Sequence, residues 1–178
     1  LRSKRNGLRN ETIFLLSVKS GLRSKEISLL SWKMVCNSDG TIGDYINLPN
    51  SSSKGNSGRI IPLHKDIKSN LQIMLMEHKG LFGFDIDKSF IVRTERTPFT
   101  TSNMIVVMFF RWYQKLGLVG CSSHSGRRTF ITETSKKISL VGGSLRDIQM
   151  MVGHSNLQTT QRYIEGDSES QRKVIDLI

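Results

Sequence analysis

Apolar residues recur at helical spacing along most of the chain. Ile13 and Leu16 lie on one face of a predicted helix, and Ile67, Leu71 and Met74 repeat the spacing further on. The periodicity continues almost to the end of the chain. It predicts helices over 10–19, over 25–30, from 65 onward, over 101–116, from 123 or 124 to about 137, over 145–151, over 156–165 and over 168–178.

Glycines and short polar residues indicate where these helices begin and end. Gly21 is suited to the left-handed position just after the first helix, since glycine has no side chain to clash there. Ser24 and Ser144 are predicted to cap the helices that follow them, because a hydroxyl oxygen can accept a free backbone N–H. Ser155, three residues before Gln158, has the spacing of a capping box.

After the second helix the pattern changes to short extended runs. Segments 32–36, 45–48 and 59–63 are predicted strands, and a turn at 37–40 follows the first of them. The segment 49–58 is too polar and glycine-rich to pack, so we expect it to be exposed and mobile. The predicted fold class is therefore α+β: one domain, mainly α-helical, with a small antiparallel β-sheet of about three strands.

Composition narrows the class of partner. The 178 residues include 26 Lys and Arg against 15 Asp and Glu, and the net charge of +11 favours nucleic acid over a solvated basic surface without a partner. No apolar run approaches the ~20 residues of a membrane span. Cys36 and Cys121 are too few for a disulfide scaffold and favour a reducing compartment. With His64 and His78 they show no metal-ligand spacing.

Three residues at predicted helix starts could hold a phosphate. Arg23 lies between the first two helices, where free N–H groups favour an anion and a guanidinium adds a bidentate fork. His124 and Arg127 are three residues apart, so they are expected to share a helix face as a clamp. The alternatives are an Arg23 that pairs with Glu26 or is solvated, and a His124 that only occupies a cap.

Three further residues could take part in phosphate chemistry. Lys54, the only basic residue of the loop before position 59, could be a general acid, a phosphate contact or a solvated lysine. His154 lies at a helix entry, nine residues before Tyr163. The phenol of Tyr163 can attack phosphorus if a cation or a base activates it. The commoner role of a tyrosine is a half-buried ring with a solvated hydroxyl.

These six residues, in this order, resemble the catalytic set of the tyrosine recombinase (phage integrase) family. The resemblance covers about residues 8 to 166. Ser125-Gly126 and Arg128 depart from the commonest family pattern, and Gly126 is expected to weaken its helix by up to ~1 kcal/mol. The matching motifs are Gly21-Leu22-Arg23-x-x-Glu26, Lys54 followed by Arg59-Ile60-Ile61-Pro62-Leu63, His124-Ser125-Gly126-Arg127-Arg128-Thr129-Phe130, and Gly153-His154-Ser155 with Thr160-x-x-Tyr163.

The resemblance implies the catalytic-domain fold of that family and DNA strand exchange through a covalent 3′-phosphotyrosine. Tyr163 is the implied nucleophile, and Arg23 and Arg127 hold the non-bridging oxygens of the scissile phosphate. No nucleotide, metal or other cofactor is implied. The remaining implied roles are His124 as an acid, base or hydrogen-bond donor, Lys54 as the proton donor to the departing 5′ oxygen, and His154 as a donor to a phosphate oxygen.

The family also implies partners and further segments. The substrate is double-stranded DNA, bound with other protomers of the same protein in a synaptic complex, in the cytoplasm and from a bacterial or phage gene. Residues 1–9, basic and without acids, resemble the linker to an N-terminal DNA-clamping domain. We therefore expect residues 10–178 to be the catalytic domain and the clamping domain to be absent from this chain. Segment 168–178 is expected to pack on a neighbouring protomer or to fold back.

Two alternatives share the same residues. A type IB topoisomerase-like enzyme would use this chemistry to relax DNA without synapsis. A non-catalytic DNA-binding remnant of an integrase would keep the basic surface alone. The presence of all six catalytic residue types favours an enzyme over a remnant.

Overall fold

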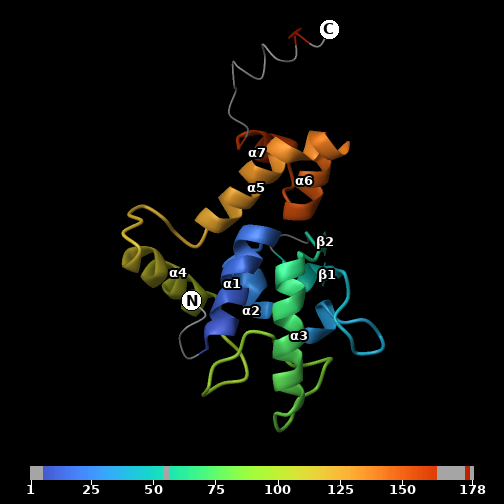
Figure 1. Ribbon diagram of the computed structural model, residues 1–178, viewed down its shortest axis with the longest axis vertical. Helices are drawn as coiled ribbons and strands as arrows, with labels where there is room; N and C mark the ends of the chain where they lie inside the picture. The colour runs from blue at the N-terminus through green and yellow to red at the C-terminus, as the bar shows by residue number, and fades with distance from the viewer. Residues whose placement is uncertain (1–5, 54–56, 164–174, 177–178) are drawn as a thin grey trace.

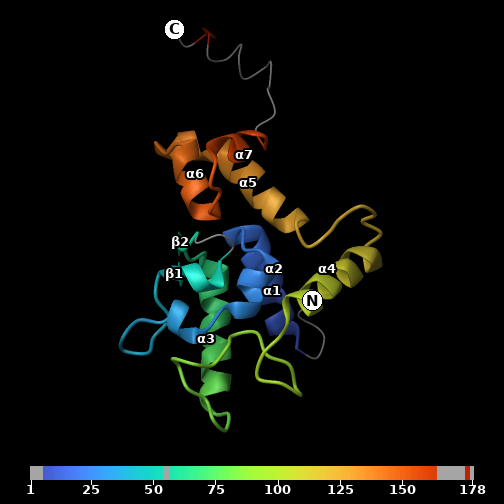
Figure 2. The ribbon, with the colours of Figure 1, turned by 180° about the vertical axis from the view of Figure 1, so that it is seen from behind.

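A computed structural model of the protein describes residues 6–53, 57–163 and 175–176. Figures 1 and 2 show a larger region that holds α1 to α4 and the strands, with α5 to α7 gathered at one end. The helices of the described residues are α1 (Gly7–Ser20), α2 (Ser24–Leu29), α3 (Lys65–Lys79), α4 (Ser102–Lys115), α5 (Ser125–Lys137), α6 (Leu145–Val152) and α7 (Leu157–Gln161). Short 3-10 helices are η1 (Trp32–Met34), η2 (Asn50–Ser52) and η3 (Ile138–Val141), and the strands are β1 (Tyr45–Leu48) and β2 (Arg59–Pro62).

Two hydrophobic cores hold these two regions. In the larger core, α1 packs against α3 while α2 packs against α4, and Ile13 and Leu16 are fully buried, as their spacing predicted. Phe109 of α4 is also fully buried; its ring stacks on Tyr113 and meets Trp112 edge-on. α1 also packs against α5, which joins the two regions. The smaller core, between α5 and α6, is built on Ile131, Ile148 and Val152.

Several predicted helix ends are confirmed. Gly21 adopts the left-handed conformation after α1, as predicted, with a φ angle of 64°. Gly153 does the same after α6, with a φ angle of 62°. Ser144 precedes α6 and donates its backbone N–H and its hydroxyl to the Asp147 carboxylate, at 2.7 and 2.8 Å. The mainly helical α+β class is confirmed as well. No helix of the described residues is long and apolar enough to cross a membrane.

The first two helices begin earlier than predicted. α1 begins at Gly7 instead of residue 10. The residue before α2 is Arg23 and not Ser24, which is the first helical residue. The reason is Glu26, whose carboxylate accepts the Arg23 backbone N–H at 2.8 Å and so satisfies one of the free donors of the helix start.

The last helices were predicted less accurately. α7 is capped by Asn156 and not by Ser155, because the Asn156 side chain accepts the backbone N–H of Gln158 at 2.8 Å. α7 ends at Gln161, whereas the prediction extended to 165, and residues 164–165 lie outside the described residues. The predicted helix over 168–178 also lies outside them, except for 175–176.

The sheet has two strands among the described residues, where about three were predicted. β1 and β2 pair antiparallel, with Leu48 opposite Arg59. The predicted strand 32–36 was wrong. Residues 32–34 form η1, and single bridges join Ser31 to Phe90 and Cys36 to Ile42. Trp32 explains the difference, because its fully buried indole donates to His78 Nδ1 at 3.2 Å and a tight turn places it there.

The loop between the strands is less exposed than predicted. Ser52 and Ser53 are buried, with 6% of each residue exposed, in and just after η2, which packs near α2. The Asn50 side chain accepts the backbone N–H of Gly58 at 2.7 Å and closes the loop. Polar side chains can therefore pack here because the loop bonds to itself. Lys54 lies outside the described residues.

Candidate active site

The candidate site lies where the two cores meet, and Arg127 crosses between them. Arg127 is 5% exposed and stands in the first turn of α5. One Nη donates to the Gly21 carbonyl at the end of α1, and the other donates to the Val152 carbonyl at 2.6 Å, at the end of α6. A single guanidinium thus holds together the ends of two helices that are far apart in the sequence.

Gly126 explains how α5 comes so close to α1. A Cβ placed on this residue would meet Ser17 Oγ and would lie 2.9 Å from Val18 Cγ1. Glycine is therefore required for the two helices to touch at this point. The same contact brings Arg127, one residue later, within reach of the Gly21 carbonyl. The glycine that weakens the helix in isolation is a packing requirement of the site.

Arg23 is joined to a buried carboxylate. Its Nη1 lies 2.9 Å from Glu26 Oε1, as the alternative interpretation of the sequence anticipated. The Arg23 side chain is 23% exposed, whereas that of Glu26 is 1% exposed. Arg23 is therefore oriented by an internal partner and still reaches the surface, an arrangement compatible with binding an anion.

Arg59 is a site residue that the sequence analysis did not identify. Its Nη1 and Nη2 bind the two oxygens of Glu26 at 2.9 and 3.0 Å, and its Nε donates to the Met151 carbonyl at 2.7 Å. The side chain is 5% exposed. One signal in the sequence could have revealed it: Arg59 begins an otherwise apolar strand, directly after the loop that carries Lys54.

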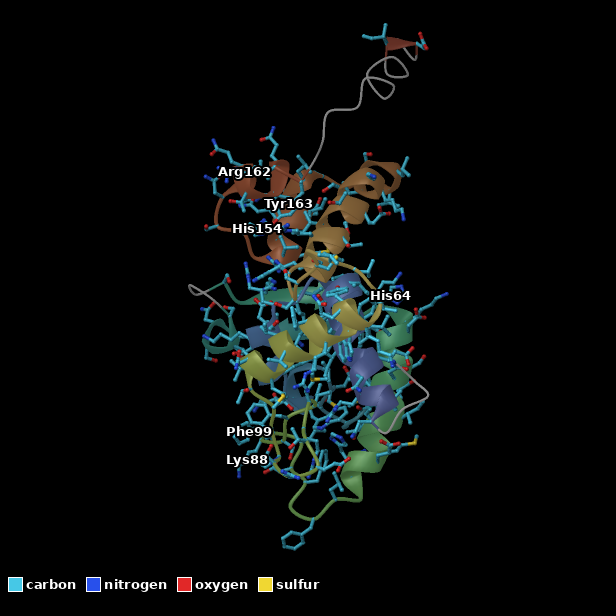
Figure 3. The ribbon with its side chains drawn as sticks, turned by 90° about the vertical axis from the view of Figure 1, so that its left-hand side faces the viewer. His64, Lys88, Phe99, His154, Arg162 and Tyr163 are labelled. Atoms are coloured by element: carbon cyan, nitrogen blue, oxygen red, sulfur yellow. The ribbon has the colours of Figure 1, made fainter. Side chains whose placement is uncertain are left out.

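His154, Thr160 and Tyr163 form the α6–α7 side of the site. The rings of His154 and Tyr163 are nearly parallel, 19° apart in orientation, with centroids separated by 6.2 Å. Figure 3 shows the two residues side by side, at the end of the molecule opposite to Lys88 and Phe99. His154 Nδ1 lies 3.0 Å from the hydroxyl of Thr160, which is fully buried. Tyr163 also packs against the smaller core.

The pKa values of the buried groups reflect this crowding of positive charge. Burial, together with the charge of Arg23, lowers the pKa of Arg127 to about 9, so the guanidinium is still charged at pH 7. Burial and the nearby arginines lower the pKa of His154 to about 4, so its ring is neutral at pH 7. Burial alone would raise the pKa of Glu26, but its bonds to Arg59 and Arg23 outweigh burial and hold it below its usual value.

The structure thus gathers four of the six predicted residues, Arg23, Arg127, His154 and Tyr163, around one junction. His124 is the residue before α5 and is exposed, whereas Arg127 is buried, so the clamp formed by these two side chains stays a prediction. Lys54 is outside the described residues. Within the described residues, no three His, Cys, Asp or Glu side chains are grouped closely enough to hold a metal ion.

This arrangement is suited to binding a tetrahedral anion beside a phenol. Arg127 uses two of its five N–H donors on carbonyl groups, and its guanidinium makes no other hydrogen bond within the described residues, so a bound anion could occupy the rest. Fixed donors of this kind stabilise charge that develops on a phosphate without reorganising. Tyr163 supplies a phenol hydroxyl, which can act as the nucleophile.

Comparison with known proteins shows the family and the fold. Tyrosine recombinase XerC of Staphylococcus epidermidis is 30% identical over 133 residues, which are 72% of this chain and 43% of that protein. The chain therefore spans about two fifths of the length of this relative. The XerH recombinase bound to its difH substrate has a similar fold, with a TM-score of 0.69, 22% identity, and coverage of 96% of this chain and 47% of the other.

A second solved structure and a family model complete the comparison. The Tn1549 transposon integrase in complex with a circular intermediate DNA gives a TM-score of 0.68 and 22% identity, over 95% of this chain and 58% of the other. The family model described as "Phage integrase family" matches residues 1–170. A match over nearly the whole sequence, together with the shared fold, shows that the chain belongs to the phage integrase family.

Proposed function

We propose that this chain is the catalytic domain of a site-specific DNA recombinase that cuts and rejoins strands through a 3′-phosphotyrosine. One observation carries the proposal: Arg23, Arg127, His154 and Tyr163 come from opposite ends of the sequence and meet at the junction of the two cores. Packing alone does not require two arginines beside a neutral histidine and a phenol. A phosphodiester as ligand accounts for all four groups together.

In the proposed reaction one phosphorus–oxygen bond forms as another breaks. The Tyr163 hydroxyl oxygen bonds to phosphorus, and the bond from phosphorus to the 5′ oxygen breaks. Arg23 and Arg127 bind the non-bridging oxygens as negative charge develops, and His154 donates a hydrogen bond to one of them. Lys54 gives a proton to the departing 5′ oxygen, while the phenol proton leaves to His124 or water. Rejoining is the reverse reaction with a new 5′ hydroxyl.

The proposed partners follow from charge and family. Double-stranded DNA is the substrate, in keeping with the net charge of +11 and with the DNA-bound XerH and Tn1549 integrase structures. Other protomers of the same protein are proposed to join in a synaptic complex. Residues 1–9 are proposed to be a basic linker, and residues 10–178 the catalytic domain. We place the reaction in the cytoplasm, where bacterial DNA is found.

The proposal is tested with nicked suicide duplexes made from the DNA that flanks the protein's own coding sequence. After cleavage the short strand dissociates, so the covalent adduct accumulates and is seen as a band shift in a denaturing gel. We expect an adduct from the full-length protein and none from Tyr163→Phe. Tyr45→Phe is the matched control, because Tyr45 is 53% exposed on β1 and should leave the adduct unchanged.

The outcomes separate the candidate functions. A protein that forms the adduct and joins two duplexes is a recombinase. A protein that forms the adduct but only relaxes supercoiled circles would be a topoisomerase-like enzyme. DNA binding without an adduct on any flanking sequence would contradict the proposal and indicate a DNA-binding remnant.

A further inference from the structure

The contact between His154 and Thr160 can decide the protonation of the histidine ring. The Thr160 hydroxyl lies 3.0 Å from His154 Nδ1. Thr160 is fully buried, although residues 155–159 just before it are all exposed. The side chain of α7 that turns inward is therefore the one that meets the histidine.

A buried hydroxyl proton needs an acceptor. Within the described residues, the Thr160 hydroxyl forms its hydrogen bond with His154 Nδ1. If Nδ1 carried a proton, it would donate to the hydroxyl oxygen, and the Thr160 proton would then lack an acceptor in this part of the chain. If Nδ1 carries no proton, it accepts from Thr160 and both groups are satisfied.

The remaining ring proton is then on Nε2. Burial and the positive charges of Arg127, Arg23 and Arg59 lower the pKa of His154 to about 4, so the ring holds a single proton at neutral pH. In the neutral imidazole, the hydrogen bond made by one nitrogen determines the protonation of the other. Nε2 has no hydrogen-bond partner among the described residues, so it can donate to a bound oxygen.

We propose that Thr160 is a positioning residue that fixes the ring of His154 in the Nε2–H tautomer. Its hydroxyl donates to Nδ1, and the opposite nitrogen becomes a hydrogen-bond donor instead of an acceptor. That the oxygen bound by Nε2–H belongs to a scissile phosphate rests on the proposed function. The tautomer itself is a property of the free protein and can be measured without DNA.

The first test is ¹⁵N NMR of the histidine-labelled chain at neutral pH, with His154→Gln to assign the resonances. We expect an unprotonated Nδ1 and a protonated Nε2 for His154. In Thr160→Val, which keeps the shape and removes the hydroxyl, the Nδ1 resonance should move and the Nδ1–H tautomer should become populated. Thr160→Ser keeps the hydroxyl and should restore the spectrum. A protonated Nδ1 in the unmodified protein, or a Thr160→Val spectrum identical to it, would overturn the proposal.

The second test measures the single-turnover rate of adduct formation by the full-length protein. Loss of one neutral hydrogen bond predicts a rate about 10-fold lower in Thr160→Val and within about 2-fold of the unmodified rate in Thr160→Ser. An unchanged rate in Thr160→Val would contradict the positioning role. If no variant forms an adduct while the expected spectra are observed, the proposed function fails and the tautomer assignment stands.

Discussion

Two histidines of this protein are held in their neutral form by their surroundings in the folded state. His78 accepts the Trp32 indole proton at Nδ1, 3.2 Å away, and burial lowers its pKa to about 4. Burial and the nearby arginines lower the pKa of His154 to about 4 as well. Both rings are neutral in the folded protein at a pH where a histidine of the unfolded chain, with a pKa near 6.5, takes up a proton.

Stability is therefore expected to decrease as the pH falls. Between pH 6.5 and about 4.5 the unfolded chain binds more protons than the folded protein, so each histidine lowers the free energy of unfolding by at most ~1.4 kcal/mol per pH unit. Urea unfolding at several pH values measures this slope. His78→Gln should reduce the slope over that range by about half. A slope that is unchanged by the substitution would show that His78 is not held neutral.

At the scale of helices and strands, the Glu26 carboxylate connects α2 to β2. It is 1% exposed and binds both Arg23 and Arg59. Glu26→Gln should destabilise the protein by about 3 kcal/mol in urea unfolding, because it leaves two buried or half-buried guanidinium groups without a counter-ion. Asp87→Asn is the matched control, since the Lys33–Asp87 pair has the same 2.9 Å distance but is exposed. We expect its effect to be below about 1 kcal/mol.

The crossing of α1 and α5 gives a second prediction at this scale. Gly126→Ala should destabilise the protein by roughly 1–3 kcal/mol, because the new methyl group would meet Ser17 and Val18. Gly80→Ala is the control, since the nearest atom to a Cβ there is 3.6 Å away and the backbone is helical. The loss should be smaller when Gly126→Ala is made in a Ser17→Ala background, which removes the nearest atom. Equal losses in both backgrounds would contradict the packing explanation.

The whole molecule carries many more basic residues than the candidate site needs. Three of the 26 basic residues, Arg23, Lys54 and Arg127, are proposed to meet the scissile phosphate. All 26 basic residues, set against 15 acidic ones, give the net charge of +11. We expect DNA affinity to fall steeply with salt, with a slope equivalent to several phosphate contacts in a plot of log K against log salt. Fluorescence anisotropy from 50 to 300 mM salt (roughly the range in which counterion release is measured) tests this. An affinity independent of salt would rule out backbone binding.

The sequence was most informative where local chemistry decides the structure. Ile13 and Leu16 predicted the buried face of α1, and Gly21 predicted its left-handed end, because spacing and the absence of a side chain act locally. The prediction failed at 32–36, where the long-range contact of Trp32 with His78 outweighs strand propensity. It also failed for Ser52 and Ser53, whose burial depends on a loop that closes on itself.

The sequence by itself determined the helical order, the basic character and the motifs that resemble the phage integrase family. It could not determine how the site is held together. Arg127 bridges Gly21 and Val152, and Arg59 bridges Glu26 and Met151, through bonds that span between 25 and 106 residues of chain. Such contacts leave no periodicity in the sequence. They exist only once the two cores have packed, which brings backbone carbonyls and a buried carboxylate within reach of the guanidinium groups.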